Sequence, residues 1–143
     1  MNLHITYSDK KHMSGFTNID ITKNKETYMK ELDAVPTSSC NAVIISEALQ
    51  LIGGEDALEV LNKSISKIRI KGTIDVSISD FERVCIDFTS GNLQLEQLNK
   101  FLPSLNSIIA LSEVKKLLAR RNVNIEKIEQ REYFLVFNGV RLA

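Results

Sequence analysis

The chain has 143 residues, of which 43% are hydrophobic, and this is enough for the core of one domain but not of two. Its 18 Lys and Arg residues balance its 18 Asp and Glu residues, so the formal net charge is zero. Proteins that neutralise nucleic-acid phosphates usually carry a basic surplus. We therefore expect a single domain, residues 1–143, without a nucleic-acid partner.

The sequence carries no sign of a membrane or secreted protein. Residues 1–6 lack the cationic flank and long apolar run of a signal peptide. The longest apolar stretches, such as residues 42–45, are far too short to cross a bilayer. Cys40 and Cys85 lie far apart and form neither a metal motif nor a disulfide framework. This pattern is typical of a cytoplasmic protein with reduced cysteines.

In the first third of the chain, alternation of apolar and polar residues predicts two short strands. They cover residues 3–7 and 16–21, and the polar stretch 8–15 between them is expected to be a loop. The charged segment 22–32 is expected to hold at most one helical turn.

The middle of the chain predicts a central strand, a helix and a further strand. Residues 42–46 form a continuous β-branched run, which suits a strand covered on both faces. From Glu55 the apolar residues recur at helical spacing, and Lys71-Gly72 is expected to end that helix. Residues 74–80 alternate cleanly and predict the next strand.

The last third predicts two helices, which span residues 95–102 and 112–122, and two closing strands. The strands, at residues 125–128 and 133–137, are expected to pair antiparallel. Asn138-Gly139 has the chemistry of a turn.

Strands that alternate with helices imply crossover connections and a largely parallel sheet. The fold class predicted is therefore an α/β three-layer sandwich, a mostly parallel doubly wound sheet with a C-terminal antiparallel hairpin. Asp75, Ser77 and Ser79 place polar groups on one face of the strand at 74–80. That face is expected to be thinly covered because the short chain lacks a helix, with contact to a partner as the alternative.

The order of these segments resembles the class I S-adenosylmethionine-dependent methyltransferases. It is most similar to the small predicted methyltransferases that are often associated with cell-surface glycan synthesis. Residues 40–49 and the Gly53-Gly54 pair resemble the middle of the family, and residues 72–81 resemble its glycine-led fifth strand. Residues 15–21 are similar to the second strand, and residues 33–36 to the turn after strand three.

The sequence departs from the family at the places that hold the cofactor. The family has a glycine-rich turn after its first strand, whereas residues 7–10 contain no glycine. Asn41 replaces an aspartate, and residues 49–51 replace a leucine-glutamate-histidine motif. The first helix is absent, and the second helix and third strand are abbreviated, so the chain is an abbreviated methyltransferase fold.

Five acidic residues follow predicted strands and are expected to lie at the carboxyl edge of the sheet, where ligands of open parallel sheets bind. They are Asp9, Asp20, Asp33, Glu47 and Asp80. The alternative for each one is that it caps the next helix or is solvated, which is the commoner role of such carboxylates.

The resemblance implies a role in cofactor binding for residues at three of these strand ends. Asp20 would accept hydrogen bonds from the ribose hydroxyls of S-adenosylmethionine. Asp33 would lie near the adenine amine, and Tyr7, Ser8 and Asp9 would line the methionine end.

The resemblance also implies a place for the methyl acceptor. Glu47 or Asp80 would face this substrate as the catalytic groups, because methyl transfer needs orientation and at most one base. His4 and His12 have no second ligand at metal-binding spacing, so no metal site is predicted.

Two functions remain open from the sequence. One is a methyltransferase that acts on a small molecule or a glycan. The other is a non-catalytic methyltransferase-like subunit, a structural or adaptor component of a larger assembly, which the missing glycines favour. A third and remote option, another nucleotide-binding α/β protein, lacks the same glycine loop. Abbreviated helices leave apolar sheet surface uncovered, so self-association or a protein partner is expected.

Overall fold

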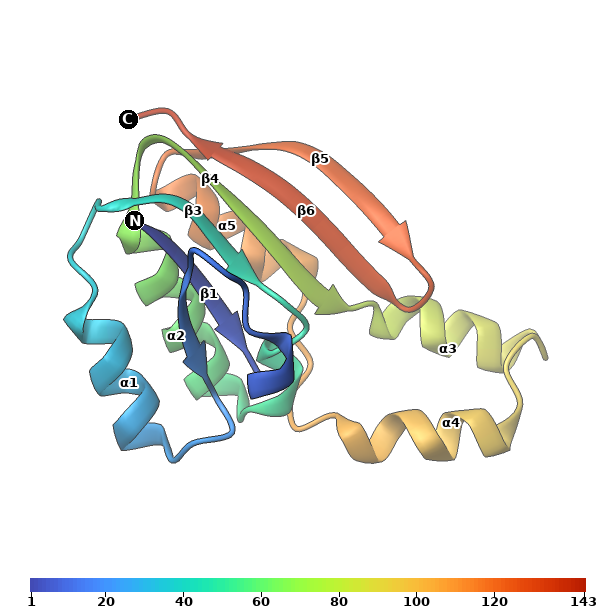
Figure 1. Cartoon of the computed structure of the whole chain (residues 1–143). Helices are drawn as coiled ribbons and strands as arrows, with labels where there is room; N and C mark the ends of the chain where they lie inside the picture. The colour runs from blue at the N-terminus through green and yellow to red at the C-terminus, as the bar shows by residue number, and fades with distance from the viewer.

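The computed structural model describes residues 1–143, with the side chain of Ser104 excepted. Within this part of the chain, six strands form one sheet in the order β2-β1-β3-β4-β6-β5 (Figure 1). β2, β1, β3 and β4 are parallel, whereas β6 is antiparallel to both β4 and β5. The predicted mixed α/β sheet with a C-terminal antiparallel hairpin is confirmed. The strands are β1 (Asn2–Thr6), β2 (Thr17–Asp20), β3 (Cys40–Ile45), β4 (Ile68–Ser79), β5 (Val123–Arg131) and β6 (Phe134–Arg141).

Three longer helices connect or flank these strands, and two more form an arm. They are α1 (Lys25–Ala34), α2 (Gly54–Lys67), α3 (Phe81–Thr89), α4 (Leu95–Phe101) and α5 (Leu111–Arg120). Single 3₁₀ turns occur at η1 (Asp9–Lys11), η2 (Leu49–Leu51) and η3 (Leu102–Ser104). The arm formed by α3 and α4, called the α3–α4 arm below, extends away from the sheet in Figure 1.

The expectation of at most one helical turn in residues 22–32 is wrong, because α1 has ten residues. The Asn24 side chain caps it by accepting a hydrogen bond from the backbone N–H of Thr27 at 2.9 Å. Tyr28, Met29 and Leu32 then fall on one buried face of this otherwise charged helix.

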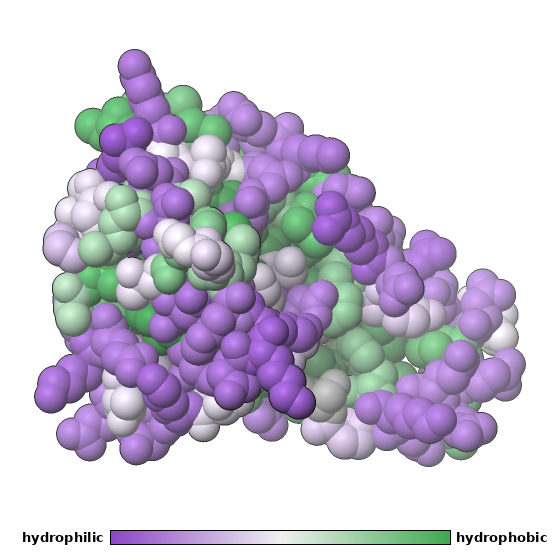
Figure 2. Space-filling model, in the orientation of Figure 1, coloured by the Kyte–Doolittle hydropathy of each residue, from purple (hydrophilic) through white to green (hydrophobic). Residues whose placement is uncertain are grey.

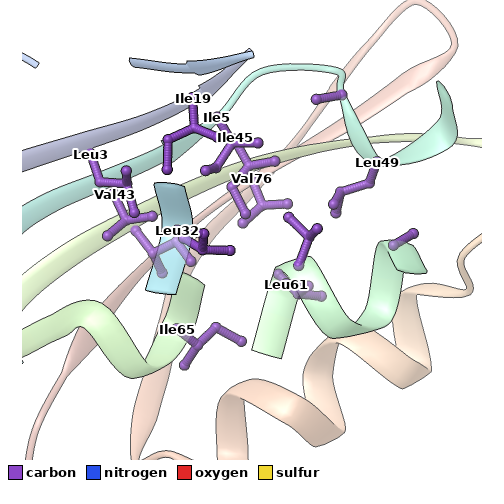
Figure 3. Close-up of a cluster of buried hydrophobic side chains, with 14 of the residues drawn as sticks. Leu3, Ile5, Ile19, Leu32, Val43, Ile45, Leu49, Leu61, Ile65 and Val76 are labelled. Carbon is purple, nitrogen blue, oxygen red and sulfur yellow. The ribbon is translucent and has the colours of Figure 1, made fainter. Parts of the chain in front are cut away.

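The hydrophobic core lies between one face of the sheet and the helices α1, α2 and α5. Leu3, Ile5, Val43, Ile45 and Val76 point to this face from β1, β3 and β4, and all are fully buried (Figure 3). Leu32 of α1 and Leu61 and Ile65 of α2 pack in the same cluster (Figure 3). Figure 1 shows α2 and α5 behind the sheet, so these helices form a complete outer layer on that side.

The opposite face, called the bare face below, carries the alternate residues of each strand. In β4 these are the polar residues predicted to lie on a thinly covered face. Asp75 and Ser77 are half-buried, whereas Ser79 is buried, with 8% of its surface exposed. Ile44 of β3 and Val136 of β6 share this face and are also only half-buried. The second outer layer of the sandwich is reduced to residues 8–16, which lie in front of β1 in Figure 1.

Two glycines that the sequence assigns to a helix end and a turn lie instead inside the sheet. α2 ends at Lys67 and β4 starts at once, and a Cβ at Gly72 would stand 2.8 Å from the carbonyl oxygen of Cys40. Asn138-Gly139 is part of β6 rather than a turn. A Cβ on Gly139 would stand 2.8 Å from Cγ1 of Val123, so close packing explains this glycine.

Candidate functional site

The strand order changes direction between β1 and β3, because β1 is followed in the chain by β2 on one side and β3 by β4 on the other. In open parallel sheets, ligands bind outside the carboxyl ends of the strands at such a switch point. Tyr7 follows the end of β1, Asp20 ends β2, and Ser46 and Glu47 follow β3. These residues therefore share one edge, which we call the switch-point edge.

Lys11 and Tyr7 contact each other at the switch-point edge. The Nζ atom of Lys11 donates a hydrogen bond to the Tyr7 hydroxyl and lies 4.4 Å from the centre of the Tyr7 ring. This hydrogen bond raises the pKa of Lys11, and the charge of Glu47 adds to the effect. Lys11 therefore places a positive charge beside Tyr7, close enough to Glu47 for the two charges to interact.

Ser8 and Asp9 build the turn that brings Lys11 to this position. Ser8 is the N-cap of η1, and its hydroxyl accepts a hydrogen bond from the backbone N–H of Lys10 at 3.3 Å. Asp9 is exposed in the first turn of η1. Both residues thus have local structural roles at the predicted cofactor end.

Asp20 lies at the end of β2, as predicted, and one of its oxygens is used locally. Its Oδ1 atom accepts hydrogen bonds from the backbone N–H of Thr22 at 2.8 Å and from the Thr22 hydroxyl at 2.7 Å. Asp20 therefore stabilises the turn after β2, which is a local structural role and the alternative to ribose binding.

A polar network on the bare face fastens residues 8–16 to the sheet. Nδ1 of His4 lies 2.8 Å from Oδ1 of Asn18, and Nε2 of His4 lies 3.0 Å from the hydroxyl of Ser46. Asn18 also bonds to the backbone of Met13 and Phe16. His4 is 2% exposed, and burial lowers its pKa, so the ring is neutral and bridges three strands.

The prediction that Asp33 lies at the carboxyl edge is wrong. Asp33 is in the last turn of α1, which runs back from the end of β2 toward the start of β3. Its Oδ1 lies 2.7 Å from Nζ of Lys63, near the end of α2. Asp33 is therefore at the opposite end of the sheet from Asp20 and Glu47, where it cannot meet a ligand bound beside them.

Glu47 and Asp80 follow the neighbouring strands β3 and β4. Glu47 has a positive φ of 50°, which is uncommon for a residue other than glycine. Asp80 caps α3, because its Oδ1 accepts from the backbone N–H of Arg83 at 3.1 Å. Its Oδ2 accepts from the Gln130 side chain at 3.0 Å, so Asp80 has structural partners on both oxygens.

Comparisons by sequence and by structure differ in what they find. No protein-family model and no curated protein matches this chain. A S-adenosylmethionine-dependent methyltransferase from Archaeoglobus fulgidus superposes with a TM-score of 0.63 at 13% identity, over 97% of this chain and 85% of that one. A methyltransferase from Thermotoga maritima, described as a possible histamine N-methyltransferase, gives 0.60 at 10% identity over 98% and 81% of the two chains.

The chain has the fold of S-adenosylmethionine-dependent methyltransferases. An O-methyltransferase family protein from Burkholderia thailandensis also superposes, with a TM-score of 0.59 at 11% identity over 90% of this chain. Our chain spans only 36% of that protein's length. At these identities the likeness establishes the architecture, while activity depends on the residues of the site.

The residues at the switch-point edge differ from the glycine-rich turn that the family resemblance places there. Glycine is used after the first strand of the family because the backbone must approach the cofactor closely, and a Cβ would intrude. Here that position holds Tyr7 and Ser8, with the Lys11 ammonium bonded to the Tyr7 hydroxyl. A sulfonium placed beside this ammonium would meet a like charge, and the Glu47 carboxylate that acts on Lys11 would offset part of the repulsion.

The described residues contain neither a cluster of metal ligands nor a membrane-spanning helix. No group of three or more His, Cys, Asp or Glu side chains there is arranged to hold a metal ion. Within the same part of the chain, no helix is both long and apolar enough to cross a bilayer.

The contributions of Lys11 and Asn18 are not predicted from the sequence patterns. Asn18 carries a usable signal, because asparagine is unfavourable inside a strand unless its side chain has local hydrogen-bond partners. Lys11 carries no such signal, since its contact with Tyr7 depends on the turn at η1.

Proposed function

We propose that this chain is a non-catalytic domain with the methyltransferase fold, which works by binding other protein chains. The observation that carries the proposal is the Tyr7–Lys11 contact at the switch-point edge. It supports the adaptor or structural role left open by the sequence over a self-contained methyltransferase.

The repulsion between the Lys11 ammonium and a bound sulfonium can be estimated. Two like charges 4 Å apart repel by about 1 kcal/mol in water and by about 4 kcal/mol at the effective dielectric constant of a protein surface. Because Lys11 is exposed, the lower figure is the relevant one. The loss of glycine at residues 7–10 adds a steric barrier, so both effects oppose the cofactor.

The bare face supports the binding role. Parallel sheets are normally covered on both faces, yet Ile44, Val136 and Val140 are only half-buried there. In Figure 2, apolar surface is visible in the hollow between the sheet and the α3–α4 arm. The chain carries no net charge that would drive copies apart, so we propose that a second copy covers this face.

A methyltransferase that acts on a small molecule or a glycan is the second candidate, and Asp20 favours it. This carboxylate stands at the end of β2, the place where the family resemblance puts a ribose ligand. Its Oδ1 is engaged by Thr22. Ribose binding would therefore depend on Oδ2 or on opening the Thr22 turn.

Calorimetric titration with S-adenosylmethionine and S-adenosylhomocysteine separates the two candidates. We expect no saturable heat from either compound. Saturable binding in the micromolar range that Asp20→Ala abolishes and Asp33→Ala retains would overturn the proposal in favour of the enzyme. Asp33→Ala is a matched control because Asp33 lies at the opposite end of the sheet.

Light scattering after size-exclusion chromatography tests the binding role. We expect a dimer that Val136→Lys converts to a monomer, because Val136 lies on the bare face of β6. Ile128→Lys is the control, since Ile128 pairs with Phe137 and so points to the other face of the same hairpin. A wild-type chain that stays monomeric at high concentration would contradict pairing of two copies.

A further inference from the structure

A cavity of about 520 Å³ lies where the α3–α4 arm joins the sheet. It is bounded by the end of β4, the start of α3, the segment before α5, and Leu135 of β6. Sites for small organic molecules commonly have volumes of roughly 300–1,000 Å³. The cavity is therefore large enough for a ligand with one or two rings.

The walls of the cavity are mainly apolar. Ile78 and Ile109 are buried, Leu111 and Leu135 are half-buried, and Ile108 is 56% exposed at its opening. An exposed isoleucine beside buried ones leaves apolar area that a ligand can remove from water. A smaller hollow of about 290 Å³ shares Phe81 and Ile108 with this cavity, so the apolar surface continues along the root of the arm.

The charged side chains that line the cavity are both acidic. Asp80 is held by Arg83 and Gln130, whereas Glu82 is exposed in the first turn of α3. The start of α5 also lines the cavity and lacks a side-chain cap. The start of α3, which Asp80 caps, lines the cavity as well. The two helix N-termini together contribute about one positive charge, which is still less than the charge of the two carboxylates. The net field in the cavity therefore favours a cation.

We propose that this cavity binds a small organic cation, an amine with an apolar body. The apolar body lies against Ile78, Ile109 and Leu135, and the ammonium group faces Glu82 and Asp80. The proposal requires neither S-adenosylmethionine nor methyl transfer, and it shares with the family resemblance only Asp80, one of the residues expected to face a methyl acceptor.

Three naphthalene probes of the same shape test the charge preference on the full chain. They are naphthylmethylamine, naphthalenemethanol and naphthoate, which at neutral pH are a cation, a neutral molecule and an anion. In low-salt calorimetric titrations we expect the amine to bind about fivefold more tightly than the alcohol, and naphthoate to bind most weakly. Glu82→Gln should reduce the preference for the amine, whereas Glu96→Gln on α4 should leave it unchanged. Equal affinities for all three probes would overturn the charge argument.

A pair of matched variants tests the location. Ala110 lines the cavity and is exposed, and Ala119 is exposed at the far end of α5. Ala110→Trp should fill the cavity and weaken binding of naphthylmethylamine at least about tenfold, while Ala119→Trp should not. Circular dichroism establishes that both variants are folded. Undiminished binding to folded Ala110→Trp, or no saturable binding to the wild-type chain, would overturn the proposal.

Discussion

The Asn18 side chain bonds residues 8–16 to the sheet. Its truncation should destabilise the protein more than is usual for a residue near the surface. Its Oδ1 lies 2.8 Å from Nδ1 of His4 and accepts from the backbone N–H of Met13 at 2.9 Å. Its Nδ2 donates to the carbonyl oxygens of Met13 and Phe16, both at 3.0 Å. Asn18→Ala therefore removes four hydrogen bonds at once.

The magnitude follows from these contacts. Each hydrogen bond contributes about 0.5–1.5 kcal/mol net, and a buried donor without an acceptor costs about 1–3 kcal/mol. His4 is 2% exposed and would lose the acceptor for one ring nitrogen. We expect Asn18→Ala to lower the free energy of unfolding by about 3 kcal/mol, since Asn18 is half-buried and water replaces part of the loss.

Urea denaturation followed by circular dichroism measures this change. Asn92→Ala is the control, because the Asn92 side chain makes one exposed hydrogen bond to Ser90 at 3.2 Å and its loss should cost less than about 0.5 kcal/mol. Hydrogen exchange should also show that the Met13 amide loses protection in Asn18→Ala. A destabilisation below about 1 kcal/mol, or unchanged Met13 protection, would refute the role assigned to Asn18.

Three further predictions concern stability. Burial lowers the pKa of His4 in the folded state, so the unfolded chain takes up the proton more readily. The free energy of unfolding is therefore highest above the ordinary histidine pKa of about 6.5 and decreases as the pH falls below that value. The urea midpoint should therefore fall less between pH values of about 7.5 and 5.5 in His4→Asn than in wild type, and an equal fall in both proteins would contradict this. Gly139→Ala should cost about 1–3 kcal/mol by overpacking, and Val123→Ala in the same chain should recover part of the loss in thermal unfolding. Asp33→Ala should change the free energy of unfolding by less than about 1 kcal/mol in urea titrations, because its pair with Lys63 is exposed, and a larger loss would contradict this.

Much of the sheet was predictable because its strands have simple residue patterns. Alternation identified β1, β2 and the second half of β4, and the β-branched run identified β3. The amino-terminal part of β4 was assigned to a helix because Ile68 continues the helical spacing of α2. The strand at this place depends on tertiary packing, in which Gly72 lies against the backbone of Cys40.

The sequence predicts the residues of the candidate site only where it predicts the ends of the strands correctly. Asp20 and Glu47 were correctly expected at one edge because each follows a parallel strand. The sequence predicts Asp33 at this edge because residues 33–36 resemble the turn after a third strand, whereas in the structure α1 carries the chain to the other end of the sheet. The network of His4, Asn18 and Ser46 joins three strands, and no local pattern encodes such a contact.

Nuclear magnetic resonance of the isotopically labelled chain during addition of S-adenosylhomocysteine tests whether the switch-point edge accepts the cofactor. The amides of residues 7–11, 20–22 and 46–47 report on the edge that Tyr7 and Lys11 occupy. We expect these signals not to move even at millimolar S-adenosylhomocysteine. Saturable shifts confined to these amides would show that the edge accepts the nucleoside and would contradict the non-catalytic role.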